Sequence, residues 1–380
     1  MTAVSRIMPK ITAVSVLLFL LLGLAGPAVA ADDITVRALF AKTPSEVRLQ
    51  APGRHISDAG GATLPAEDCR IVLAGPERGV VCGEQRLTRA PFVLAQTAAG
   101  TTFLIHVGTE KRRYSGALRL AERDQRLRLE ITLPLDDYVA GVLAAETVHD
   151  EKAYLEALAV VVRHHALAAG DQGRRPVADD TRVQMFRGLP TGPRAKNLSD
   201  VARRTAAWTL SVDGRRAPAF YHACCGGRTR HVRDVWPKLA SWSHLHGVRC
   251  ADEEGRAWCR DNKWYRWNRR VPLEKWTAFL QSKFGAARAE RRHGNPLISL
   301  TGGGSVPAWR FRMTLCRELG WNTAPSDDFA ISNQAHIVML DGKGFGHRVG
   351  LCQAGALAQA KAGRSAEDIL HFYFPEARIW

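Results

Sequence analysis

The sequence predicts an α+β fold in which mixed helices and antiparallel strands surround a groove, preceded by a small β-rich N-terminal region. Short runs of partly alternating apolar and polar residues fill residues 31–125, which is typical of half-buried strands. Apolar residues at helical spacing then indicate two consecutive helices, at 133–146 and 150–169. We therefore expect a β-rich region over 31–115 and a mixed domain over 116–380.

The first thirty residues have the features of a signal peptide. Arg6 and Lys10 precede an apolar run over residues 14–24, and the Ala-Val-Ala sequence at 28–30 fits a cleavage site. The alternative is an uncleaved anchor helix, although the apolar run is short for a span of about 20 residues. In either case we expect export to the periplasm or cell envelope, with membrane contact only if this segment is retained.

The chain is basic, with 53 Lys and Arg against 37 Asp and Glu and a formal net charge of +16. In an exported protein such a charge suggests an anionic partner, such as the cell wall or a membrane surface. Nucleic acid is not expected outside the cytoplasm. The basic residues are dispersed along the chain, so a soluble basic surface without a specific partner is the alternative.

Eight cysteines in an exported chain permit disulfides. Cys69 and Cys82 flank a short segment and could close a hairpin-like loop. The other six fall in two later groups, Cys224, Cys225, Cys250 and Cys259 first and then Cys316 and Cys352. Their pairing cannot be read from the sequence.

The first predicted helix carries a carboxyl on its apolar side. Glu146 continues the stripe formed by Leu135, Tyr138, Val139, Val142 and Leu143. Pro134 suits the first turn, and the two aspartates after Leu135 favour the positive helix N-terminus. A carboxyl on a buried face must be paired or have a raised pKa, and a raised pKa suits a general acid. A buried ion pair with an arginine such as Arg163 is the structural alternative.

The remaining elements follow from turn and cap signals. We expect loops over 171–200 and a hairpin turn at Asp213-Gly214. His165 lies on the apolar face of the second helix, where we expect a hydrogen-bonded core histidine. Near the C-terminus a strand precedes a glycine-rich loop and a helix that Gly363 ends. Ser365 and Asp368 form a capping box for a last helix.

Four segments, in this order, carry a resemblance to a known family. They are LPLDDYVAGVLAAE, the helix ending VVVRHHALA, FYHACCGGRT, and GKGFGHRVGLCQAGALAQAKAG with the trailing DILHFYFPEARI. They resemble the SpoIID/LytB family of sporulation stage II protein D and the amidase enhancers, over roughly 116–380. The sequence departs from the family pattern at several positions: Leu158, His164, His165, Arg348 and Cys352.

The resemblance implies peptidoglycan glycan strands as partner and substrate. Enzymatic members of the family are lytic transglycosylases that cleave between N-acetylmuramic acid and N-acetylglucosamine without a cofactor. Glu146 matches their catalytic glutamate, which would serve first as acid and then as base to leave a 1,6-anhydro end. Hydrolases, in contrast, use two carboxylates. The alternative is a non-catalytic wall-binding protein that stimulates a cell-wall amidase. A metal-dependent hydrolase using the His and Cys residues is a weaker third reading.

The resemblance also implies substrate-binding residues. Arg163, His347 and Gln353 match family positions and would contact the glycan or orient Glu146. Gly344 and Gly346 would let a loop pass close to the sugar chain. Arg348 would then lie beside the groove, where it could meet the lactyl carboxylate of muramic acid.

Two residue groups have competing interpretations. His222, Cys225, Cys250 and Cys259 form a plausible structural zinc set, but a Cys250–Cys259 disulfide with a second bridge from Cys225 is slightly preferred. A tryptophan-rich stretch could stack on pyranose rings, although a core role is favoured. The stretch covers residues 236–270, and the residues considered for stacking are Trp258, Trp264 and Trp267.

Overall fold

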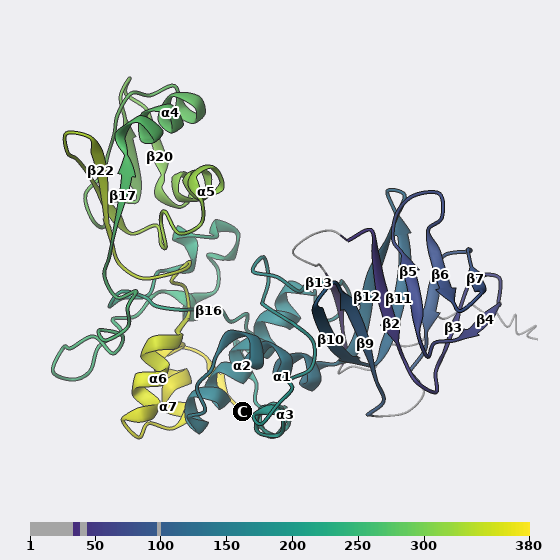
Figure 1. Cartoon of the computed structure of the whole chain (residues 1–380). Helices are drawn as coiled ribbons and strands as arrows, with labels where there is room; N and C mark the ends of the chain where they lie inside the picture. Colours follow the sequence, from purple (N-terminus) through teal and green to yellow (C-terminus); the bar gives the residue numbers. More distant parts are fainter. Residues whose placement is uncertain (1–32, 39–43, 97–99) are drawn as a thin grey trace, which may run out of the picture. The chain divides into compact units, whose positions relative to one another are not determined.

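The computed structural model describes residues 33–38, 44–96 and 100–380 (Figure 1). The signal peptide expected over 1–30 lies outside the described residues. The described part is mixed α+β, as predicted, with helices and several mostly antiparallel sheets. None of its helices combines the length and the apolar character that a membrane span requires.

The β-rich N-terminal region consists of two sheets. Their orders are β13-β1-β12-β11-β8-β3-β4 and β10-β9-β2-β5-β6-β7. Alternate residues of β12 are buried, because successive side chains of a strand point to opposite faces. The strands are β1 (Asp33–Ala38), β2 (Glu46–Gln50), β3 (His55–Ser57), β4 (Thr63–Pro65), β5 (Cys69–Val72), β6 (Gly79–Cys82), β7 (Gln85–Leu87), β8 (Phe92–Leu94), β9 (Thr102–Val107), β10 (Glu110–Ser115), β11 (Ala117–Arg123), β12 (Arg126–Pro134) and β13 (Val177–Ala178).

Cys69 and Cys82 form a disulfide, which confirms the loop closure expected from their spacing. The antiparallel register of β5 and β6 places the two cysteines directly opposite each other. The domain boundary expected between 115 and 116 stays a prediction. Strands from both sides of it belong to one sheet, since β11 pairs with both β8 and β12.

Three helices follow the N-terminal sheets, and the first two confirm the sequence prediction. They are α1 (Leu135–Glu146), α2 (Lys152–Ala169) and α3 (Ala195–Arg204). The chain passes from β12 directly into α1, whose apolar stripe is buried. Arg163 of α2 ties the three helices together, because its guanidinium lies 2.7 Å from Asp136 Oδ1 of α1 and donates to Ala202 O of α3 at 2.8 Å.

Two distant segments meet in a short parallel strand pair. β16 (Tyr221–His222) pairs with β23 (Leu351–Cys352), and further backbone bonds extend the contact on both sides. α6 (Gln353–Lys361) follows β23 directly, and α7 (Ala366–Tyr373) begins with the predicted capping box. The remaining small elements here are β14 (Leu210–Val212), β15 (Arg215–Arg216), η1 (Val232–Asp234), η2 (Pro237–Leu239), η3 (Ser243–Leu245) and β24 (Arg378–Ile379).

Residues 267–342 form an inserted module with a hydrophobic core of its own, which we did not predict. Aromatic side chains, among them Trp276, Phe279 and Phe311, fill that core. Its elements are β17 (Trp267–Pro272), α4 (Leu273–Phe284), β18 (Ala289–Glu290), β19 (Leu297–Leu300), β20 (Ser305–Pro307), α5 (Ala308–Leu319), β21 (Phe329–Asn333) and β22 (Ile337–Gly342).

The tryptophan-rich stretch packs into the protein, as favoured from the sequence. Trp267 is buried, and its indole N–H donates to Gly344 O at 2.8 Å. Trp258 and Trp264 are half-buried against the main hydrophobic core.

Candidate active site

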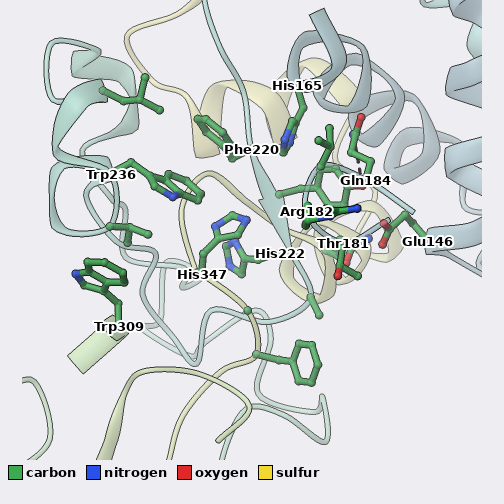
Figure 2. Close-up of a pocket in the computed structure, with 18 of the residues that line it drawn as sticks. Glu146, His165, Thr181, Arg182, Gln184, Phe220, His222, Trp236, Trp309 and His347 are labelled. Carbon is green, nitrogen blue, oxygen red and sulfur yellow. Dashed lines mark hydrogen bonds between the residues drawn. The ribbon is translucent and has the colours of Figure 1, made fainter. Parts of the chain in front are cut away.

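A pocket of about 720 Å³ collects most of the residues that the sequence indicated. Glu146 lies at one end in Figure 2, Trp236 and Trp309 lie at the other, and His222 and His347 lie between them. The pocket has the size and mainly apolar lining of a ligand site. Its lining residues also include His165, Thr181, Arg182, Gln184, Phe220, Tyr221, Lys238, Phe345, Gly346 and Gln353.

Glu146 is the last residue of α1 and is half-buried. Its Oε1 accepts a hydrogen bond from the backbone N–H of Met185 at 3.1 Å. The hydroxyl of Tyr221 hydrogen-bonds the same carboxyl. Gln184 fixes that tyrosine, because its side-chain amide donates to the Tyr221 hydroxyl at 3.4 Å and accepts from Tyr138 at 3.1 Å. The carboxyl is therefore held by neutral groups only.

The pKa of Glu146 is raised above its ordinary value. Burial is the main cause, and the hydrogen bonds from Met185 and Tyr221 only partly oppose it. The position at the end of α1 acts in the same direction as burial, because the C-terminal end of a helix carries partial negative charge. The alternative reading, an ion pair between Glu146 and Arg163, does not hold, since Arg163 is bound to Asp136 instead.

Three polar atoms of the pocket wall lack a hydrogen-bond partner among the described residues. They are Nδ1 of His165, Nε2 of His222 and Nε2 of Gln353. Buried polar groups are usually hydrogen-bonded in folded proteins, so bound water or a polar ligand would satisfy these three atoms.

The pocket histidines are neutral at neutral pH. Burial lowers the pKa of His165 to about 4 and that of His222 to about 3, and it holds the pKa of His347 well below its ordinary value. His222 donates from Nδ1 to Val349 O at 3.1 Å, so its Nε2 is a hydrogen-bond acceptor, and the residue lines the pocket. A ligand hydroxyl would donate to it.

Four buried cysteines form a second cluster, beside the strand pair of β16 and β23. The sulfur atoms of Cys225, Cys250, Cys259 and Cys352 all lie within 4.8 Å of one another. The disulfide preference is wrong in this structure, because all four cysteines are free. Sγ of Cys225 and Sγ of Cys259 are 3.5 Å apart, whereas bonded sulfurs lie about 2.05 Å apart.

The ligand set expected from the sequence also changes, because Cys352 takes the place assigned to His222. The imidazole of His222 bonds to Val349 O and lines the pocket. Cys352 lies at the N-terminus of α6, where its sulfur accepts N–H bonds from Cys225 at 3.2 Å and Gly355 at 3.4 Å. Such bonds stabilise a thiolate.

The geometry of the cysteine cluster fits a structural metal. A zinc ion held tetrahedrally at about 2.3 Å from each sulfur needs sulfurs about 3.8 Å apart. The observed separations, within 4.8 Å, are close to this value. Four buried thiols leave no open coordination position, which is the arrangement of structural rather than catalytic zinc sites. The cluster could therefore hold a structural metal ion such as zinc.

Comparison with known proteins relates the segment that contains Glu146 to one family. The sequence profile of SpoIID, stage II sporulation protein, matches residues 123–211. Residues 123–211 of this chain therefore carry the sequence pattern of the SpoIID family. It is 22% identical over 340 residues to stage II sporulation protein D of Bacillus subtilis, covering 82% of this chain and 93% of the relative.

Two further relatives show the same level of similarity. Stage II sporulation protein D of Bacillus amyloliquefaciens is 23% identical over 265 residues, 64% of this chain and 73% of the relative. An uncharacterised protein of Brachyspira hyodysenteriae is 25% identical over 266 residues, 69% of this chain and 70% of the relative. The family resemblance read from the four segments is thus confirmed.

The predicted binding residues divide into two groups. His347, Gly346 and Gln353 line the pocket together with Glu146. Arg163 and Gly344 are not among the described residues that line it. Arg163 holds three helices together through its contacts with Asp136 and Ala202. A Cβ on Gly344 would lie 2.8 Å from Cys224 O, so this glycine permits close backbone packing.

Arg348 also lies elsewhere than expected. It is buried and pairs with Asp328 Oδ2 at 2.8 Å, so it does not face the pocket as a free cation for a lactyl carboxylate. His165, in contrast, lies in the pocket although it was expected in the core. It was expected to be hydrogen-bonded in the core, but it lines the pocket with Nδ1 unpartnered by any described residue.

Several pocket residues were missed from the sequence. Gln184 and the backbone of Met185 come from the segment expected to be loop, and no motif marks them. Trp236 comes from the tryptophan-rich stretch, and Trp309 from the inserted module. Tyr221 adjoins His222 in a segment with family resemblance, but only the folded geometry shows its hydroxyl at Glu146.

Glu146→Gln is expected to stabilise the fold near neutral pH. A carboxyl whose pKa is raised in the folded state costs stability as the pH rises from its ordinary pKa to the raised one, whereas glutamine stays neutral at every pH. The gain in melting temperature should therefore be full above the raised folded-state pKa, shrink as the pH falls through it, and be gone below about 4.3, the ordinary pKa of glutamic acid. Thermal unfolding across a pH series measures it.

The matched control is Glu46→Gln, which removes a carboxyl 3.3 Å from Arg70 at the surface. Surface pairs contribute little to stability, so this variant should show no gain at neutral pH. A melting temperature for Glu146→Gln equal to or below that of the unsubstituted protein at neutral pH would contradict the buried-acid description.

Proposed function

We propose that the protein is an exported peptidoglycan lytic transglycosylase with Glu146 as its single acid and base. The observation that carries this proposal is a raised-pKa carboxyl in a pocket with three unpartnered polar atoms. Of the described residues that line the pocket, Glu146 alone has a carboxyl group. Glycoside hydrolases use a pair of carboxyls, so one carboxyl favours a reaction that needs no activated water.

The reaction uses one proton twice. Protonated Glu146 donates to the oxygen that links muramic acid to the next glucosamine, and the bond from that oxygen to the anomeric carbon breaks. The resulting carboxylate then accepts the proton of the muramic C6 hydroxyl while that oxygen bonds to the anomeric carbon. A 1,6-anhydro end forms, and Glu146 is protonated again. Tyr221 and the Met185 N–H orient the carboxyl throughout.

The wider properties of the chain support an envelope location. A net charge of +16 favours attraction to anionic wall polymers once the protein is exported. The names of the two Bacillus relatives place those proteins in sporulation. For this chain we propose glycan strands of the cell wall as the substrate.

The same pocket also suits the alternative function, an amidase enhancer that binds glycan without cleaving it. His165 favours this reading, because it stands in the pocket where the family pattern has tyrosine. Binding requires the unpartnered polar atoms of the pocket but not the raised pKa of Glu146. A cell-wall amidase would then be the partner.

Digestion of purified glycan strands tests the two functions. The unsubstituted protein should release products with 1,6-anhydro ends, detected by mass spectrometry, from intact or stem-stripped strands. Loss of the general acid in Glu146→Gln should slow release by about 10²-fold or more, while Glu46→Gln should keep the unsubstituted rate. Glycan binding without anhydro product from any variant would contradict the enzyme and support the enhancer.

We also propose that the cluster of Cys225, Cys250, Cys259 and Cys352 holds one structural zinc ion. Purified protein should contain zinc at about one ion per chain. Cys352→Ser should lose the metal and lower the melting temperature, because metal binding contributes to folding free energy. Elemental analysis and thermal unfolding measure both effects.

Cys316→Ser is the control for that experiment. Cys316 is also buried and free, but it belongs to the core of the inserted module and is not part of the cluster. It should keep the zinc. Metal-free protein in which thiol titration finds the four cysteines paired would contradict the proposal and restore the disulfide interpretation.

A further inference from the structure

The end of the pocket farthest from Glu146 in Figure 2 carries two tryptophans that the proposed chemistry does not use. Trp236 precedes η2 and is half-buried. Trp309 lies in the first turn of α5 and is 42% exposed. His222 and His347 separate both tryptophans from Glu146 (Figure 2). Large aromatic side chains exposed in a pocket need an explanation beyond core packing.

The ring of Trp236 is fixed by its neighbours. Its centroid lies 4.7 Å from that of Phe220 and 4.9 Å from that of His347, and both partners line the pocket. Its backbone N–H donates to Val232 O at 2.7 Å. The indole is thus presented to the pocket in one orientation, and a ligand that stacks on it would lose little ordering entropy.

Trp309 is brought to the pocket by the inserted module. Arg312, one turn along α5, donates to Ala324 O at 2.8 Å and to Pro325 O at 2.9 Å. Pro325 O also accepts from the N–H of Gly346, a residue of the pocket wall, at 3.0 Å. One carbonyl therefore links the helix of Trp309 to the loop that holds His347.

Buried ion pairs fix the same contact. Asp327 pairs with Arg230, and Asp328 pairs with Arg348 at 2.8 Å. Both aspartates belong to the inserted module, and both arginines lie outside it. Breaking one partner of a buried pair is strongly destabilising, so these pairs hold the module at the pocket edge. The exposed face of Trp309 is consequently a fixed part of the pocket wall.

We propose that Trp236 and Trp309 form a second sugar subsite, at which a unit of the same glycan strand stacks away from the bond that Glu146 would cleave. The ligand class rests on the proposed function. Pyranose rings have apolar C–H faces that pack on aromatic rings, and the polar rim of the sugar stays hydrated. A strand held at both ends of the pocket gains affinity over a short saccharide that fills only one end.

The test measures binding without turnover. In Glu146→Gln protein, calorimetry gives the affinity for N-acetylglucosamine oligomers from the disaccharide to the hexasaccharide. Affinity should rise with length in the parent protein. Trp309→Ala should remove that rise and weaken hexasaccharide binding about tenfold. Trp236→Phe, which keeps the packing on Phe220, should weaken it by a smaller factor.

The control is Trp321→Ala, which removes a tryptophan that is 56% exposed on the same module but does not line the pocket. It should bind like the parent. Unchanged length dependence in Trp309→Ala would overturn the subsite, whatever the cleavage assay shows. Absence of anhydro products would overturn the cleavage reaction alone, since binding is measured separately. No binding of any oligomer by the parent would overturn the subsite as well.

Discussion

The contact between residues 220–225 and residues 345–354 is the constraint on which the candidate site depends. β16 and β23 pair in parallel. The backbones of Cys224 and Phe345 form an antiparallel β-bridge, and the Ala354 N–H donates to Ala223 O. One side of this contact supplies His222, His347 and Gln353 to the pocket. The same two segments supply Cys225 and Cys352 to the cysteine cluster. A metal bound there would cross-link the two strands that form the pocket wall.

Glu146 acquires its character from placement rather than from a charged partner. It lies half-buried at the negative end of α1, and its hydrogen bonds come from an amide and a tyrosine. Arg163 could have neutralised Glu146, but it binds Asp136 instead. Its contacts hold α1, α2 and α3 together. Arg163 therefore stabilises the packing of the helices, and the Glu146 carboxyl has no charged partner among the described residues, in a pocket whose histidines are neutral.

Local patterns predicted the local structure, and long-range contacts explain what they missed. Helical spacing gave α1 with Glu146 on its buried side, and the cap signals gave α7. The partners of Glu146 could not be predicted, because Met185 and Gln184 come from a loop without periodicity. Cys352 was missed as a cluster member because its approach to Cys225 depends on strand pairing across more than a hundred residues. No sequence motif in residues 267–342 indicates a separate hydrophobic core, so the inserted module was not predicted.

A structure of the Glu146→Gln protein with a bound glycan oligomer tests the central claim most directly. We expect a glycosidic oxygen of the bound oligomer to lie within about 3.2 Å of the side chain at position 146 in this variant. We also expect sugar polar groups bonded to Nε2 of His222 and Nε2 of Gln353, the pocket atoms that lack partners among the described residues. An oligomer bound outside this pocket, or one whose glycosidic oxygens all lie out of reach of residue 146, would contradict the claim.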